Sequence, residues 1–211
     1  MSENSPTEKS HGEDRAAEDR LRVAMIVAST REGRFAPVVA AWARGHLDRH
    51  AELTADTVDL AEIPLPTVLP AFDGPPPEGT AEALAAISPR LAAADAFVIV
   101  TPEYNHSYPA PLKAAIDWHN AEWHAKPVAF VSYGGVSGGL RAVEHLRGVL
   151  AELHSVTMRN TVSFHGGWGC FDEEGGVREP ASDAAATVML DQLAWWAHAL
   201  RDAKAVRPYQ G

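Results

Sequence analysis

Three short segments carry the residues best able to bind a ligand, and each directly follows an apolar run. The first, residues 28–36, reads ASTREGRFA and combines hydroxyls with Arg31 and Arg34. Before a helix, these residues would lie beside free backbone N–H groups and the positive end of the helix dipole, which suits a phosphate. The GxxxxGK[ST] and GxGxxG spacings are missing, so a mononucleotide phosphate is the simplest anion. Alternatively, Ser29 and Thr30 only cap the helix and the arginines point to solvent.

The second segment, residues 101–107, reads TPEYNHS. A proline-fixed turn is followed by an acid, an aromatic ring and an amide, which suits a planar heteroaromatic ligand with polar edges. Glu103 could instead cap a helix or contact a second subunit, and Tyr104 could be a rim aromatic. His106 is interpreted as a surface histidine, and no catalytic acid or base is predicted in this segment or elsewhere.

The third segment, residues 133–139, reads YGGVSGG and has four glycines in seven positions. Glycine lets the backbone approach a ligand closely, and a following helix would direct its first N–H groups toward the same place. A flexible turn explains one or two glycines but explains four poorly. The segment is therefore predicted to line a binding site.

Strands and helices alternate along the chain, and this alternation must position the three segments. Apolar runs predict strands at residues 21–29, 53–60, 96–101, 127–133 and, more weakly, 156–164. Helical patterns cover residues 37–50, 80–93, 109–120, 138–153 and 181–203. Strict alternation predicts a parallel sheet with helices on both faces. Ligands bind such sheets outside the carboxyl ends of the strands, so we expect the three segments to converge.

Composition narrows the class of protein. The chain has 211 residues, 46% of them hydrophobic, which favours one domain over residues 21–204. The net charge of −10 argues against nucleic acid and anionic membranes as partners. One cysteine, Cys170, excludes an internal disulfide, and a cytoplasmic location is expected. Residues 1–20 are charged and lack an apolar segment, which predicts a disordered tail, and residues 205–211 are predicted to fray.

Together the segments identify a family resemblance. The pattern ASTREGRF, then TPEYNHSYPAPLKAAIDW, then KPVAFVSYGGVSGGLRAVEHLR resembles the NADPH-dependent FMN reductases, flavodoxin-like proteins that include azoreductase-like and quinone-reductase-like members. The resemblance covers residues 21–164, and the middle motif is its most specific part. It implies a flavodoxin-like, doubly wound α/β fold with a five-stranded parallel sheet in the order 2-1-3-4-5.

The resemblance also implies a cofactor and its ligands. FMN would be bound, with NADPH or NADH as co-substrate and a small electron acceptor such as a flavin, quinone or azo compound. The implied FMN-binding residues are Ser29, Thr30, Arg31, Arg34 and Phe35 around the phosphate, Pro102, Glu103, Tyr104 and Asn105 along the ring, and Tyr133, Gly134, Gly135, Ser137, Gly138 and Gly139 at its other edge. Many relatives have Ser and Asn further along the first segment, where this chain has residues 33–36 reading GRFA.

The resemblance further suggests a homodimer or homotetramer, with the helix at residues 109–120 and the nearby Trp118 and Trp123 packed against a second subunit. A flavodoxin-type electron carrier and a flavin-free binding or regulatory module are the two other hypotheses. No metal site is predicted, because His119 and His124 have no metal-ligand spacing and are expected at solvated helix ends. Residues 165–171 are either a lid over the flavin or a surface connection.

Overall fold

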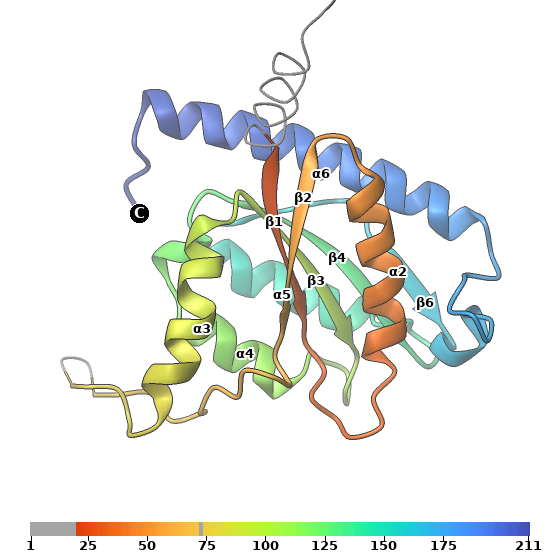
Figure 1. Ribbon diagram of the computed structural model, residues 1–211, viewed down its shortest axis with the longest axis horizontal. Helices are drawn as coiled ribbons and strands as arrows, with labels where there is room; N and C mark the ends of the chain where they lie inside the picture. The colour runs from red at the N-terminus through yellow and green to blue at the C-terminus, as the bar shows by residue number, and fades with distance from the viewer. Residues whose placement is uncertain (1–19, 72–73) are drawn as a thin grey trace, which may run out of the picture.

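The computed structural model describes residues 20–71 and 74–211, and its central feature is a parallel sheet with the strand order β2-β1-β3-β4-β5 (Figure 1). The strands are β1 (Leu21–Val27), β2 (Leu53–Asp59), β3 (Ala96–Pro102), β4 (Pro127–Gly134), β5 (Val156–Thr157) and β6 (Val162–His165). The predicted α/β fold and sheet order are confirmed. The predicted disordered tail lies outside the described residues except for Arg20.

The fifth position of the sheet is filled by two short strands rather than one. Both β5 and β6 pair in parallel with β4, and residues 158–161 interrupt the edge between them. The Arg147 guanidinium donates hydrogen bonds to the backbone carbonyls of Met158 at 2.7 Å and Arg159 at 3.3 Å. The chain therefore places two short strands here, of two and four residues, in place of one long strand. Neither is long enough for a clear apolar run, so the sequence predicts this strand only weakly.

The helices follow the predicted alternation closely. They are α2 (Ala36–Arg49), α3 (Thr80–Ala93), α4 (Ala110–Asp117), α5 (Leu140–Glu152) and α6 (Ala181–Val206), with short 3-10 helices η1 (Ala121–Trp123) and η2 (Gly167–Cys170). Pro109 is the N-cap of α4, just before the first turn in which it was predicted. The last helix ends at Val206, three residues after its predicted end at residue 203. Beyond it, the hydroxyl of Tyr209 lies 3.0 Å from Nδ1 of His154. No helix among the described residues is long and apolar enough to cross a bilayer.

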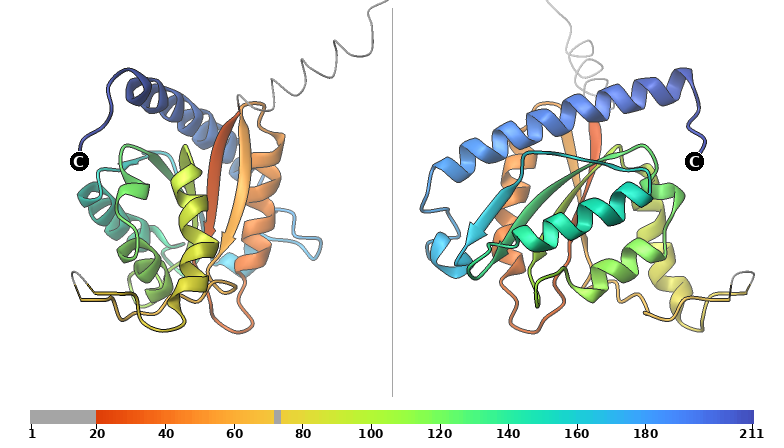
Figure 2. Two further views of the ribbon diagram at one scale, coloured as in Figure 1. Left: turned by 60° about the vertical axis from the view of Figure 1, so that its left-hand side comes forward. Right: turned by 180° about the vertical axis from the view of Figure 1, so that it is seen from behind.

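Helices cover both faces of the sheet, and each face has its own apolar core. One core joins alternate β1 residues such as Val23 and Met25 to α2 and α6. The other joins Ala24 and Ile26 to α3, α4 and α5. The views in Figure 2 show α2 and α3 on opposite sides of β1 and β2. Every residue of β3 and β4 is buried, which explains why both strands are mostly apolar, as expected for central parallel strands.

Two sequence expectations about individual side chains are wrong. Trp123, expected near a subunit contact, is fully buried, with its ring centroid 4.6 Å from that of Phe97. His119, expected in solvent, is 4% exposed and bonds the carbonyl of Ala115 and the hydroxyl of Ser88. Both residues lie just after α4. Trp123 packs in the apolar core on that face of the sheet, and His119 lies against Ser88 of α3.

Asp183 fastens α6 to α2 and gives a testable pH dependence. Its Oδ1 accepts hydrogen bonds from Trp42 Nε1 at 2.9 Å and His46 Nε2 at 2.8 Å. Burial alone would raise the pKa of Asp183, but these bonds lower it below its ordinary value. A carboxyl whose pKa is lower in the folded than in the unfolded protein stabilises the fold at pH values above its unfolded-state pKa. This stabilisation is lost as the pH falls through the folded-state pKa.

We expect Asp183→Asn to lower the free energy of unfolding by no more than about 1 kcal/mol at pH 7, because solvent screens this half-exposed side chain. The difference from the wild type should shrink as the pH falls below about 4, where the wild-type carboxyl begins to take up a proton. Urea unfolding at pH 7 and at about pH 3 measures both values. A deficit that is equally large at the two pH values would contradict this assignment.

Candidate functional site

The first loop, residues 28–35, follows β1 and is organised around Ser29. The Ser29 side chain is buried, and its Oγ lies 2.7 Å from the hydroxyl of Tyr104 in the second loop. Nη1 of Arg34 donates to the backbone oxygen of Ser29 at 2.7 Å. Phe35 is the N-cap residue of α2, and no side chain caps this helix. The alternative in which Ser29 or Thr30 caps the helix is therefore wrong. Pro37 has no N–H, and the Val38 N–H bonds the carbonyl of Phe35 at 3.1 Å. Among the first three residues of α2, the N–H of Ala36 is therefore the one that could donate to a ligand.

Arg34 is braced by an acid that the sequence reading did not connect to it. Its guanidinium forms a bidentate pair with Asp59, at the end of β2, with both N–O distances 2.6 Å. The hydrogen bonds to the Asp59 carboxylate raise the pKa of the Arg34 guanidinium above its ordinary value. Among the residues that the structure describes, Nε and one hydrogen on Nη2 have no acceptor and could donate to a ligand. Arg31 and Thr30 are exposed at the mouth of the loop.

The second loop is a tight turn in a strained backbone conformation. Tyr104 and Ser107 exchange two backbone hydrogen bonds of 2.8 and 3.0 Å. Between them, Asn105 and His106 have positive φ angles of 47° and 76°. Two-residue turns with positive φ usually contain glycine, and such strain in other residues is concentrated at functional sites. Pro102 ends β3 opposite Tyr133 of β4, which fixes where the turn begins.

The third loop, residues 134–139, requires its last two glycines. Gly138 and Gly139 have φ angles of 61° and 89°. A Cβ on Gly138 would lie 2.6 Å from Oγ of Ser163, and one on Gly139 would lie 2.7 Å from Cβ of Ser132. The same two serines donate hydrogen bonds to the carbonyl of Gly138 at 2.7 and 2.9 Å. The loop is therefore clamped between β4 and β6 and leads directly into α5, whose N-cap residue is Gly139.

Two observations indicate room and unmet bonding capacity for a ligand. A Cβ placed on Gly135 would meet no atom within 4 Å, so space is open in front of the third loop. The hydroxyl of Tyr133 is buried without a hydrogen-bond partner among the described residues, and its burial raises the pKa of the phenol well above its ordinary value. Ser29 is near enough to influence that pKa, but its own hydroxyl is paired with Tyr104.

Glu103 connects the second and third loops. Its Oε2 accepts a hydrogen bond of 2.5 Å from Ser137, and its Oε1 forms an ion pair with Arg141. Burial alone would raise the pKa of the Glu103 carboxyl, but the hydrogen bonds from Ser137 and Arg141 and the charge of Arg141 lower it below its ordinary value. The carboxylate is therefore ionised and neutralised within the wall of the site.

A fourth segment, residues 165–171, lies against the first loop. The rings of Trp168 and Phe35 are stacked with centroids 6.2 Å apart, although Trp168 is 70% exposed. Phe35 also packs edge-on against Tyr133 and Phe171. The segment therefore belongs to the rim of the site, and its role as a lid stays a prediction.

The structure brings all the predicted site residues to one edge of the sheet, where the loops after β1 and β3 lie low in Figure 1. Contacts link the first loop to the second through Ser29 and Tyr104, and the second to the third through Glu103 and Ser137. The sequence reading missed Asp59, Arg141 and Ser163, which hold the loops in place.

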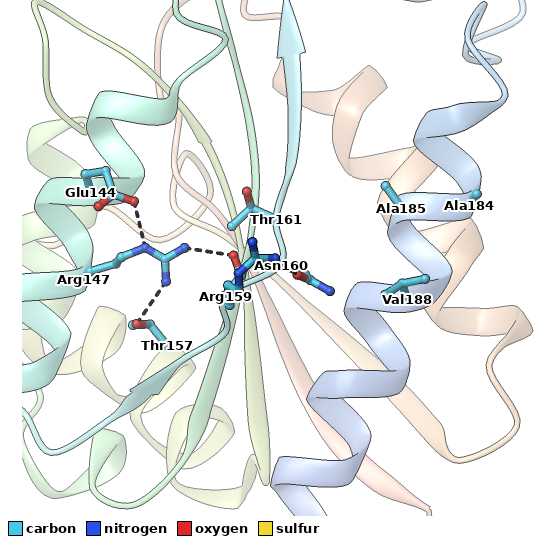
Figure 3. Close-up of a pocket in the computed structure, with 9 residues that line it drawn as sticks. All are labelled: Glu144, Arg147, Thr157, Arg159, Asn160, Thr161, Ala184, Ala185 and Val188. Atoms are coloured by element: carbon cyan, nitrogen blue, oxygen red, sulfur yellow. Dashed lines mark hydrogen bonds and ion pairs between the residues drawn. The ribbon is translucent and has the colours of Figure 1, made fainter.

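A separate cavity of about 890 Å³ lies beside the interrupted sheet edge and is bounded by α5 and α6 (Figure 3). None of the three loops lines it. Arg147, one of the two arginines that line it, is already bonded to Glu144 and to backbone carbonyls. The convergent loops have open space in front of Gly135 and, among the described residues, an unpaired Tyr133 hydroxyl, so they are the better candidate for a functional site.

The sheet order defines the class: this is a flavodoxin-like protein, and its three convergent loops lie at the carboxyl ends of β1, β3 and β4, where sheets of this kind bind ligands. The family model for NADPH-dependent FMN reductase matches residues 21–169. The chain belongs to the NADPH-dependent FMN reductase family.

Individual relatives agree with this assignment. The chain is 37% identical over 143 residues to an NAD(P)H-dependent FMN reductase of Schizosaccharomyces pombe, a match that covers 65% of this chain and 70% of that one. It is 36% identical over 154 residues to a quinone reductase of Escherichia coli, covering 71% and 79% of the two chains.

Solved structures show the same fold. A flavoenzyme NAD(P)H:(acceptor) oxidoreductase from Paracoccus denitrificans matches with a TM-score of 0.61 at 24% identity, covering 85% of this chain and 98% of that one. An oxidoreductase from Corynebacterium diphtheriae matches with a TM-score of 0.60 at 18% identity, covering 86% and 98%.

Proposed function

We propose that this chain is an FMN-dependent NAD(P)H oxidoreductase whose three convergent loops hold the flavin. The observation that carries the proposal is the junction of these loops at the carboxyl edge of the sheet, with open space in front of Gly135. Membership of the FMN reductase family and similarity to FMN and quinone reductases support the same activity.

Each loop would hold a different part of FMN. The first loop would bind the phosphate through Ser29, Thr30, Arg31, the remaining donors of Arg34 and the backbone N–H of Ala36, the first residue of α2. Phe35 would flank it. The second loop would line the ring with the residues of its strained turn, Pro102, Glu103, Tyr104 and Asn105. The third loop would border the other edge with Tyr133, Gly134, Gly135, Ser137, Gly138 and Gly139.

FMN, when bound, supplies the hydride chemistry between NAD(P)H and the acceptor. The chain itself contributes position and electrostatics. Backbone N–H groups of the third loop and the positive end of α5 can stabilise negative charge that develops on a bound ring. The paired Glu103 adds little net negative charge to the wall, so it does not oppose this effect.

The narrower features of the proposal concern acceptor, assembly and location. Quinones and free flavins are the proposed acceptors, because relatives are named for them. A homodimer or homotetramer in the cytoplasm remains our proposal. A pure electron carrier is disfavoured because the first loop reads STREGR, unlike the T-x-T-G-x-T pattern of flavodoxins.

We expect the purified protein to take up FMN at one equivalent per chain and to be bleached by NADPH under anaerobic conditions. Visible absorbance during an NADPH titration measures both events, and added quinone should restore the oxidised spectrum. Bound FMN that NADPH cannot bleach would identify an electron carrier. A protein that stays colourless with excess FMN would indicate a flavin-free binding module.

A further inference from the structure

Glu103 presents an electrostatic problem at the junction of the second and third loops. Its side chain is only 6% exposed, yet its pKa below the ordinary value keeps it ionised. Ser137 and the backbone N–H of Arg141 each donate a hydrogen bond to the carboxylate, but neither group carries a full positive charge. A covered carboxylate without a cation is costly, so the position needs a compensating positive charge.

Arg141 provides that charge from outside the predicted site. It is the second residue of α5, and its guanidinium reaches back to Oε1 of Glu103. Among the described residues it is the one cation that forms an ion pair with Glu103. The arginine itself is 45% exposed, so the pair has one partner in the wall of the site and one in solvent.

We propose that Arg141 is a positioning residue for the flavin: by neutralising Glu103, it holds the turn at residues 104–107 against the third loop. The inference rests on the proposed function, because the position of this turn matters through the ring that it lines. Without Arg141, the carboxylate gains by turning toward water, which breaks its bond to Ser137 and separates the two loops.

Four variants test the proposal. Arg141→Met removes the charge and keeps most of the side-chain volume, whereas Arg141→Lys keeps the charge. The double variant Glu103→Gln/Arg141→Met removes both charges and leaves an amide oxygen that can accept from Ser137. Arg44→Met is the matched control, because Arg44 is 40% exposed and pairs with Asp48, an acid that is itself 51% exposed.

FMN affinity is the first measurement, by quenching of flavin fluorescence. Arg141→Met should weaken binding by about tenfold or more, as expected when a covered ion pair loses one partner. Arg141→Lys should stay within about threefold of the wild type, and so should Arg44→Met. The double variant should bind FMN more tightly than Arg141→Met. A double variant as weak as Arg141→Met would overturn the proposal and indicate that Arg141 contacts the ligand directly.

Hydrogen exchange in the flavin-free protein is the second measurement. The amides of Tyr104 and Ser107 bond each other's carbonyls across the turn. They should exchange several-fold faster in Arg141→Met and return to the wild-type rate in the double variant. Unchanged exchange in Arg141→Met would also overturn the proposal. If the wild type binds no FMN, the proposed function fails, and this experiment still decides whether Arg141 fixes the turn.

Discussion

Gly135→Asp is expected to weaken FMN binding strongly while the protein stays folded. A Cβ at Gly135 would meet no atom within 4 Å, so the free chain has room for the substitution to begin there. The same space is where the ring edge of FMN would lie, and a carboxylate there would both fill it and repel negative charge on the ring. We expect a loss of affinity of roughly 100-fold or more, since burying an unpaired charge costs several kcal/mol. Flavin fluorescence titration and a thermal melt measure the two effects.

Gly148→Asp is the matched control for this variant. A Cβ on Gly148 would also meet no atom within 4 Å, but this glycine lies in the middle of α5, away from the three loops. Its substitution should leave FMN affinity unchanged. Equal affinity in Gly135→Asp and the wild type would mean that the flavin does not occupy the space in front of the third loop, and the proposed binding mode would be wrong.

The fold was largely predictable because apolar residues are spaced differently along the strands and along the helices. The continuous apolar runs at β1, β3 and β4 reflect burial on both faces, which any sequence reading can detect. Both ends of α3 and the start of α6 fall at the predicted residues, and the other helix ends differ by one to three residues. Differences of this size are expected because helix ends fray and the apolar pattern does not fix them. The break between β5 and β6 depends on a side chain from α5, Arg147, and therefore has no local signal.

The site was predictable as three loops but not as a network. Local composition marked each loop, and the parallel topology brought them together. The partners that hold them are distant in sequence: Asp59 is 25 residues from Arg34, and Glu103 is 34 residues from Ser137. Contacts of this kind follow from how neighbouring strands align in the folded sheet, and the spacing of residues along the sequence does not reveal them. The sequence therefore identifies Arg34 as a basic residue of the first loop. The structure adds that Asp59 fixes its guanidinium in place.

Arg34→Met is expected to weaken FMN binding strongly and riboflavin binding little. Arg34 fixes the first loop through Asp59 and the backbone of Ser29, and its remaining donors face a bound phosphate in the proposed function. Riboflavin lacks that phosphate, so its affinity depends on the other two loops. The loss of two charge-assisted hydrogen bonds, about 3 kcal/mol, corresponds to a roughly 100-fold fall in FMN affinity. Paired titrations with FMN and riboflavin give the ratio directly.

Arg90→Met separates loss of the phosphate ligand from loss of an ion pair. Arg90 forms a similar bidentate pair with Asp56, also on β2, but it comes from α3 and does not touch the first loop. Its removal should leave the ratio of FMN to riboflavin affinity unchanged. Arg34→Lys should not restore the ratio, since an ammonium cannot reproduce the guanidinium's planar fork. If Arg34→Met weakens both ligands equally, the first loop acts on the whole flavin, and a phosphate role for Arg34 is refuted.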